Sequence, residues 1–163
     1  MSNHIIIKKY VARLQITVNN RLRKLDFTAN NIKGNIPNEF SNFLMMEILL
    51  LGGNMLTGRF SQAILNLSTL TNLHLSFNHL SGELPSNFLY SLPDLQVLAL
   101  DYNFFQGHIP SSLGNDSNIR VLDISSNNFT GVVPSSIGKL SKLYWLNLNP
   151  INSKHIKGKI GSL

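Results

Sequence analysis

The sequence contains no cysteine, few charged residues and no long apolar run. Without cysteine, the 163-residue chain has no disulfide and no thiolate chemistry. Charged residues make up 13% and hydrophobic residues 43%, the opposite balance to a disordered chain and enough for one domain with a core. No window approaches the roughly 18 apolar residues of a membrane span. Lys8, Lys9 and Arg13 interrupt the apolar stretch near the N-terminus, so the sequence predicts neither a secretory signal nor an anchor.

Acidic residues are absent from both ends of the chain. Residues 1–25 carry six Lys or Arg and residues 139–163 carry five, whereas residues 26–138 carry three together with all eight acids. The net charge of +6 therefore comes from the two ends. A nucleic-acid-binding protein needs a contiguous basic face on its folded part, so this distribution argues against nucleic acid as a partner.

A repeated unit of 24 or 25 residues fills most of the chain. It reads L-x-x-L-x-L-x-x-N-x-L-x-G-x-I-P, and its copies begin at Leu22, Met46, Leu70, Leu95 and Ile119. A sixth copy begins at Leu143 and departs from the pattern where Ile151 replaces the asparagine. The ninth position predicts a structural asparagine ladder of Asn30, Asn54, Asn78, Asn103 and Asn127. The thirteenth position holds Gly34, Gly58, Gly82, Gly107 and Gly131. A period of 20–29 residues with this spacing is typical of the leucine-rich repeat.

Each part of the unit has a physical reason. The L-x-L step puts alternate side chains on the buried face of a short strand. An asparagine amide donates and accepts at once, so stacked asparagines can satisfy buried backbone groups where the chain leaves the strand. Glycine permits backbone angles that side chains forbid, and proline restricts the returning segment. One coil cannot bury its own apolar face, so neighbouring coils stabilise one another.

We therefore predict an α/β-type repeat, a right-handed leucine-rich-repeat solenoid with a parallel β-sheet on its concave face. The convex side is expected to be mostly β, irregular and 3-10 structure, closed by the apolar pairs Phe40/Phe43, Ile64/Leu67, Phe88/Leu92 and Ile137/Leu140. The predicted organisation has three parts. Residues 1–21 form a basic segment or degenerate cap, residues 22–148 form five full repeats and the start of a sixth, and residues 149–163 form an irregular segment.

The second half of the unit resembles one family. The run GHIPSSLGNDSNIRVLDISSNNFTGVVPSSIGKLSKLYWLNL resembles the plant-type extracellular repeats of receptor-like kinases and receptor-like proteins. It is most similar to the subfamily with receptors for bacterial elicitors and rice blight resistance, and the resemblance covers about residues 22–148. The resemblance implies a secreted, N-glycosylated, membrane-anchored parent that binds peptides, proteins or co-receptors on its strand face. Some members also carry a cytoplasmic serine/threonine kinase.

The sequence lacks several features of that family, namely cysteine-bearing caps, a transmembrane helix and the kinase motifs. We interpret it as a fragment, a truncated gene product or a mispredicted gene model, and a genuine small repeat protein is the alternative. The chain is expected not to be an enzyme. The parent is expected at the plasma membrane with this part on the extracellular face, and a cytoplasmic location is the alternative for this chain.

Candidate ligand-binding residues lie where the repeat leaves the identity free, at the third, fifth, seventh and eighth positions. Phe77 and Tyr102 share one position on adjacent coils and predict an exposed aromatic pair, which suits protein or peptide recognition. The alternative is that they only cover the asparagine ladder. Ile48 and Leu50 form an apolar patch, either an interface or simple drift. The predicted binding residues are His74, Ser76, Phe77, Ala99, Asp101, Tyr102, Asp123 and Ser125.

Three sequons place potential N-glycosylation at Asn66, Asn115 and Asn128, provided that the chain enters the secretory pathway. The five histidines show no ligand spacing, so we predict no metal and no cofactor. Asp101 and Asp123 lie on neighbouring coils, but an open sheet gives them no desolvating cleft for acid–base catalysis.

The sequence predicts a protein- or peptide-recognition module, and the resemblance implies that it is part of a plant receptor-like kinase ectodomain in defence or developmental signalling. The expected partners are a protein or peptide ligand and a co-receptor ectodomain, and a membrane is expected only through the anchor of a parent protein. Two alternatives stay open. One is a receptor serine/threonine kinase whose kinase domain is absent from this sequence, and the other is an intracellular leucine-rich-repeat scaffold.

Overall fold

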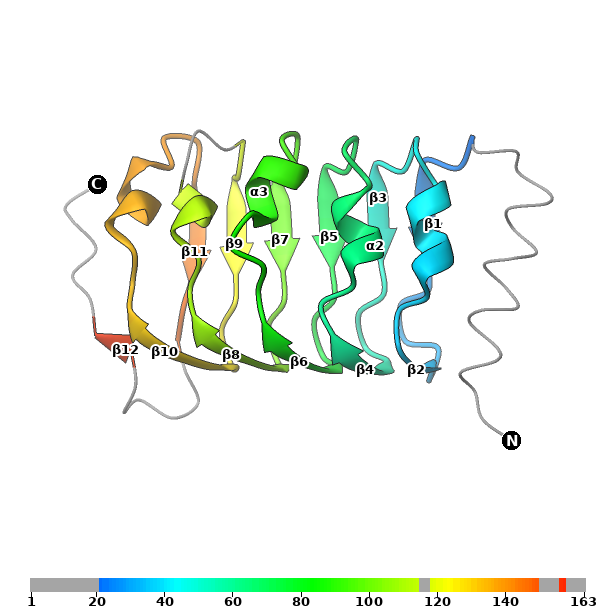
Figure 1. Ribbon diagram of the computed structural model, residues 1–163, viewed down its shortest axis with the longest axis horizontal. Coiled ribbons are helices and arrows are strands. Elements are labelled where there is room, and N and C mark those ends of the chain that lie inside the picture. The colour runs from blue at the N-terminus through cyan, green and yellow to red at the C-terminus, as the bar shows by residue number, and fades with distance from the viewer. Residues whose placement is uncertain (1–20, 115–117, 150–155, 158–163) are drawn as a thin grey trace.

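The computed structural model describes residues 21–114, 118–149 and 156–157 as a row of coils stacked side by side (Figure 1). Each coil contributes one short strand to a first sheet, whose order β1-β3-β5-β7-β9-β11 follows the chain. Its strands are β1 (Lys24–Asp26), β3 (Ile48–Leu50), β5 (Asn72–His74), β7 (Val97–Ala99), β9 (Val121–Asp123) and β11 (Trp145–Asn147). All five neighbouring pairs are parallel, as the repeat predicts.

In the first sheet, residues at the same position of the repeated unit lie opposite one another on neighbouring strands. The central leucine of each strand lies opposite the central leucine of the next, so that Leu49 pairs with Leu73 and Leu73 with Leu98. These three leucines are fully buried, whereas the residues on either side of them point away from the core. A period of 24 or 25 residues therefore produces one continuous buried row and one continuous outer face. We call this outer face the strand face.

A second parallel sheet runs along the edge of the coils, in the order β12-β10-β8-β6-β4-β2 (Figure 1). Its strands are β2 (Lys33–Gly34), β4 (Met55–Arg59), β6 (His79–Glu83), β8 (Phe104–His108), β10 (Asn128–Val132) and β12 (Ile156–Lys157). Sequence reasoning predicted β structure outside the first sheet but not this continuous ladder. It forms where each coil passes the glycine at the thirteenth position of the unit, and those glycines have φ between +78° and +94°. Side chains disfavour such angles.

Short helical turns cover the side of the core opposite the first sheet (Figure 1). Three are 3-10 turns, as predicted: η1 (Asn38–Asn42), η2 (Ser111–Gly114) and η3 (Ser135–Lys139). The other two are single α-turns, α2 (Gln62–Leu65) and α3 (Phe88–Ser91). The four predicted apolar pairs of this side are all buried, which confirms their place in the core. Within the described residues, no helix is long and apolar enough to cross a membrane.

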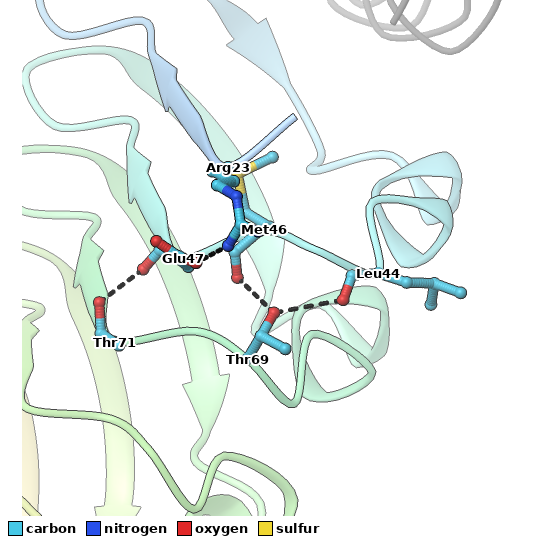
Figure 2. A network of polar contacts seen from close by, with 6 residues as sticks. All are labelled: Arg23, Leu44, Met46, Glu47, Thr69 and Thr71. Atoms are coloured by element: carbon cyan, nitrogen blue, oxygen red, sulfur yellow. Dashed lines mark hydrogen bonds and ion pairs between the residues drawn. The ribbon is translucent and has the colours of Figure 1, made fainter. Parts of the chain in front are cut away.

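Polar contacts join the first three coils at the edge where each returning segment enters its strand (Figure 2). The Arg23 guanidinium pairs with the Glu47 carboxylate across neighbouring coils. The Thr71 hydroxyl donates to the Glu47 carbonyl at 2.9 Å, and the Thr69 hydroxyl donates to the Met46 carbonyl at 2.8 Å. The threonines satisfy carbonyls on the preceding coil, so this edge fixes the spacing between coils.

The predicted division of the chain is only partly covered by the described residues. Residues 22–148 contain five coils and the first strand of the sixth, with residues 115–117 outside the description. The predicted N-terminal segment, apart from residue 21, and most of the predicted segment 149–163 also lie outside the described residues. Those boundaries therefore stay predictions.

Candidate recognition surface

The asparagines of the ladder connect each coil to the one before it. The Asn78 side-chain oxygen accepts the Leu56 N–H at 2.9 Å, and its amide nitrogen donates to the carbonyls of Leu51 and Leu75, both at 3.0 Å. Asn54, Asn103 and Asn127 repeat this arrangement and are also buried. Asn30 differs because it is exposed, and its amide donates to the Thr28 carbonyl at 2.8 Å. The ladder thus fixes the backbone at the end of each strand.

The residue before each ladder asparagine turns the chain outward with a positive φ. In the first five coils this position holds Ala29, Gly53, Phe77, Tyr102 and Ser126, with φ between +52° and +66°. A bulky side chain is uncommon at such angles. Here the backbone is held from both sides: the Phe77 N–H, for example, donates to the Asp101 carbonyl at 2.9 Å. The side chains at this position therefore project from the strand face and can differ from coil to coil.

Phe77 and Tyr102 form a stacked aromatic pair on the strand face. Their ring centroids lie 4.3 Å apart with an angle of 12° between the planes. Phe77 is 56% exposed and Tyr102 is 48% exposed. The two rings lie against one another and still leave about half of their surface to solvent. Such an exposed aromatic pair can contribute to binding without first being uncovered.

Two carboxylates lie near the aromatic pair, Asp101 on the same coil as Tyr102 and Asp123 on the next coil. The Ser76 hydroxyl donates to the Asp101 carboxylate. The Asp123 carboxylate accepts the Ser125 hydroxyl at 2.6 Å and the Asn147 amide at 3.1 Å. These bonds hold both carboxylates in fixed positions. Both aspartates keep part of their surface open to solvent.

A hollow of about 530 Å³ opens in the strand face over the first three coils. It is lined by Lys24, Thr28, Ile48, Leu50, Gly52, Gly53, Asn72, His74, Ser76 and Phe77. Three residues of the predicted binding set therefore lie in its wall. Asp101, Tyr102, Asp123 and Ser125 lie beyond the hollow on the next two coils, and Ala99 is 8% exposed. The predicted set thus divides into a hollow and a neighbouring polar and aromatic row.

The glycine pair at Gly52 and Gly53 was the signal that sequence reasoning missed. In the other coils these two positions hold side chains, such as Ser76 and Phe77 on the third coil. Glycine at both positions leaves the floor of the second coil uncovered between the side chains of Thr28 and Phe77. The apolar patch of Ile48 and Leu50 lies in the same hollow.

His74 lies in the wall of the hollow, and its pKa is shifted by its surroundings. Burial lowers the pKa of His74 below its ordinary value of 6.5, and the negative charge of Asp101 partly opposes this shift. The imidazole is therefore neutral at neutral pH. Among the described residues, no group of three or more His, Cys, Asp and Glu side chains could hold a metal ion.

Two of the three sequons are described, and both acceptor asparagines are exposed outside the first sheet. Asn66 follows the α2 turn, and Asn128 begins strand β10 of the second sheet. Asn115 lies outside the described residues. Carbohydrate at Asn66 or Asn128 would not start from the strand face.

The parallel stack of coils, the asparagine ladder and the variable strand face together define a leucine-rich-repeat solenoid. Two leucine-rich-repeat family models match the chain, one over residues 93–152 and the other over residues 21–43 and 69–90. Receptor-like protein 39 of Arabidopsis thaliana is 41% identical over 98 residues, which are 59% of this chain and 11% of that protein. The chain therefore spans about a tenth of the length of the curated relatives it matches.

Solved structures give the same result. The ectodomain of the Arabidopsis thaliana receptor kinase GASSHO1/SCHENGEN3, in complex with CASPARIAN STRIP INTEGRITY FACTOR 2, matches with a TM-score of 0.77 and 37% identity over 85% of this chain and 16% of that chain. The Arabidopsis receptor kinase HAESA, in complex with the peptide hormone IDA and the co-receptor SERK1, matches with a TM-score of 0.77 and 27% identity over 83% and 23%. The chain is a leucine-rich-repeat solenoid, and it is similar to the ectodomains of plant receptor-like proteins and receptor kinases. The matched structure of GASSHO1/SCHENGEN3 is a leucine-rich-repeat ectodomain, which is the kind of domain that the sequence predicts for this chain. The finer resemblance to elicitor and blight-resistance receptors stays a prediction.

Proposed function

We propose that this chain is a recognition module of plant cell-surface signalling that binds an extended peptide or protein segment on its strand face. The observation that carries the proposal is the hollow over the first three coils, which continues into the exposed stack of Phe77 and Tyr102. The similar structures of GASSHO1/SCHENGEN3 and HAESA are complexes with CASPARIAN STRIP INTEGRITY FACTOR 2 and with the peptide hormone IDA, which supports the same use of this fold.

The mechanism is display on a rigid scaffold. The asparagine ladder and the two parallel sheets fix the backbone of every coil before a ligand arrives. Binding to a preformed surface avoids much of the entropy cost of ordering loops. The strand-face positions are not needed for the core, so their side chains set the specificity. The ladder thus stabilises the fold, whereas the strand-face side chains determine which ligand binds.

We also propose that the longer protein resides at the plasma membrane with this part outside the cell, and that a co-receptor ectodomain is a second partner. The support is the complex of HAESA with a co-receptor and the exposure of both described sequon asparagines. Expression behind a secretory leader in plant cells tests the glycosylation. An N-glycosidase should shift the electrophoretic band of the wild-type chain and shift less when Asn66→Gln and Asn128→Gln are combined. A native tissue protein that runs near 18.2 kDa and does not respond to the enzyme would favour an intracellular scaffold instead.

Peptide binding is tested with a displayed library of random twelve-residue peptides, selected against the whole chain. Gly53→Phe is the variant that fills the hollow, because Phe77 occupies the equivalent position with a similar positive φ. Met55→Phe is the matched control, since it adds a phenyl ring on the same coil but on the exposed side of the second sheet. Phenylalanine is tolerated there, because Phe104 occupies the equivalent position two coils later. Selected peptides should bind the wild type and Met55→Phe equally and bind Gly53→Phe at least tenfold more weakly. Equal binding to all three would remove the hollow from the proposed function.

A further inference from the structure

The hollow is suited to an apolar side chain because most of its lining surface is apolar, although Thr28, Asn72 and Ser76 also line it. Gly52 and Gly53 leave the floor open, and Ile48, Leu50 and the Phe77 ring stand around it. The charged group in its lining is Lys24, whose ammonium lies 3.8 Å from the Asp26 carboxylate of the same strand. A ligand side chain that enters the hollow therefore leaves water for apolar contacts and does not meet an unpaired charge. Such burial is favourable in proportion to the apolar area covered.

The next coils have the opposite character, because their strand face is negatively charged. The strand-face positions of the third, fourth and fifth coils carry two carboxylates, Asp101 and Asp123, and no lysine or arginine. Asp101 directly precedes Tyr102 in the chain, next to the aromatic stack. The open π faces of Phe77 and Tyr102 attract a cation that lies within about 6 Å. Aromatic faces and a fixed carboxylate at one place complement a guanidinium or an ammonium group.

The spacing between these two regions limits the ligand. Adjacent strands of a sheet lie about 4.8 Å apart, so the second and fourth coils are separated by about 10 Å. An extended peptide covers about 3.3 Å per residue, and two or three residues therefore span from the glycine floor to the aromatic stack. Both regions lie at the seventh and eighth positions of the unit, along one line across the coils.

We propose that the strand face selects a peptide that places an apolar side chain in the hollow over Gly52 and Gly53 and, two or three residues away, a lysine or arginine over Phe77 and Tyr102 beside Asp101. This inference rests on the proposed function and adds the chemical class of the ligand. The apolar residue gives the peptide its anchor, and the cation selects among peptides that carry such an anchor.

The random twelve-residue library tests this pattern directly, with the wild-type chain as target and Gly53→Phe as the counter-target. Enriched peptides should carry an apolar residue and a Lys or Arg two or three positions apart. Enrichment of peptides without a basic residue would overturn this inference and leave the proposed function standing. Failure to enrich any peptide over the counter-target would overturn both.

A selected arginine peptide then allows a double-mutant cycle. Asp101→Asn should weaken its binding about three- to tenfold, and Tyr102→Ser should weaken it by a similar factor. Serine is tolerated there, because Ser126 adopts a φ of 53° at the equivalent position of the fifth coil. The same peptide with Gln in place of Arg should bind the wild type and Asp101→Asn equally. Glu83→Gln, which removes an exposed carboxylate from the second sheet, is the control and should leave the affinity unchanged.

Salt dependence gives a second readout that a loss of folding would not imitate. The affinity of the arginine peptide for the wild type should fall as NaCl rises from about 0.05 to 0.5 M, because salt screens partly exposed charges. The affinity of the glutamine peptide should stay nearly constant over that range. An Arg-to-Gln effect of the same size in the Asp101→Asn variant as in the wild type would show that the cation does not meet this carboxylate, and would overturn the inference.

Discussion

Replacing one buried asparagine of the ladder should destabilise the solenoid far more than replacing its exposed equivalent. Asn78→Ala removes the acceptor of the Leu56 N–H and the donor to the carbonyls of Leu51 and Leu75. The two carbonyls each keep another amide donor, because Asn54 also donates to Leu51 and Asn103 also donates to Leu75. The Leu56 N–H loses its acceptor in a fully buried residue.

The loss in the free energy of unfolding can be worked out from the Leu56 N–H, which loses its acceptor, and from the two carbonyls, which each keep a donor. A buried N–H without a partner costs about 1–3 kcal/mol, and the weakened bonds to the two carbonyls add about 1 kcal/mol. Asn78→Ala should therefore reduce the free energy of unfolding by roughly 3 kcal/mol. Asn30→Ala is the matched control, since Asn30 holds the same position of the unit but is exposed. Its loss should cost about 0.5 kcal/mol, as is usual for surface substitutions.

Urea unfolding followed by circular dichroism measures both variants against the wild type. With a slope of about 1–3 kcal/mol per molar urea, Asn78→Ala should lower the midpoint by about 1–3 M and Asn30→Ala by no more than about 0.5 M. The slope should be reported too, since repeat proteins can unfold in more than one step. Equal shifts for the two variants would refute the view that the ladder stabilises the coils through buried backbone groups.

Three further predictions test the core, the packing of the helical turns and the hollow. Phe105→Ala should reduce the free energy of unfolding in urea by about 3–5 kcal/mol, because the Phe105 ring is buried. Phe104→Ala should reduce it by less than about 1 kcal/mol, because the Phe104 ring on the same strand is exposed. Gly114→Ala should destabilise by about 1–3 kcal/mol or more, since a Cβ there would lie 2.0 Å from a backbone carbon of η3, whereas Gly138→Ala meets nothing within 4 Å and should be neutral. His74→Asn should abolish a loss of stability that the wild type shows as the pH falls from about 7 to 5: the folded chain has the lower histidine pKa, so the unfolded chain takes up the proton first. Identical pH profiles for the two proteins would contradict this last prediction.

The repeat predicts much of the fold because the same spacing carries both register and burial. A residue at one position of the unit pairs with the residue one period later, as Leu49 does with Leu73, so the parallel sheet follows from counting. The buried convex pairs follow in the same way, because they recur at matching positions of the unit. The continuous second sheet could not be predicted from the period of the repeat alone. It depends on backbone angles at the thirteenth position, which glycine permits but does not require.

The candidate site was harder to predict, because it depends on what is missing from one coil. Sequence reasoning found Phe77 and Tyr102 as an aromatic pair, and the structure places their rings in contact. It did not find the hollow, since two glycines at positions 52 and 53 add no side chain that would suggest a binding site. Only the neighbouring side chains turn that absence into a space, and their directions come from the positive φ at the eighth position of the unit.

That eighth position should accept substitutions that change binding and leave stability almost unaltered. It holds Ala, Gly, Phe, Tyr and Ser in five successive coils at nearly the same φ, so its backbone angle is set by the coil and not by the side chain. Gly53→Phe costs about 1–2 kcal/mol for a side chain in the left-handed region, but it regains about 0.4–1 kcal/mol because the unfolded chain loses freedom. The new Cβ lies 3.5 Å from its nearest neighbour outside the adjoining residues, an ordinary contact. The net loss is at most about 1.6 kcal/mol, so the urea midpoint of Gly53→Phe should fall by no more than about half of the shift expected for Asn78→Ala. A shift as large as that of Asn78→Ala would mean that the glycine pair is needed for folding, and the loss of peptide binding in Gly53→Phe could then not be assigned to a filled hollow.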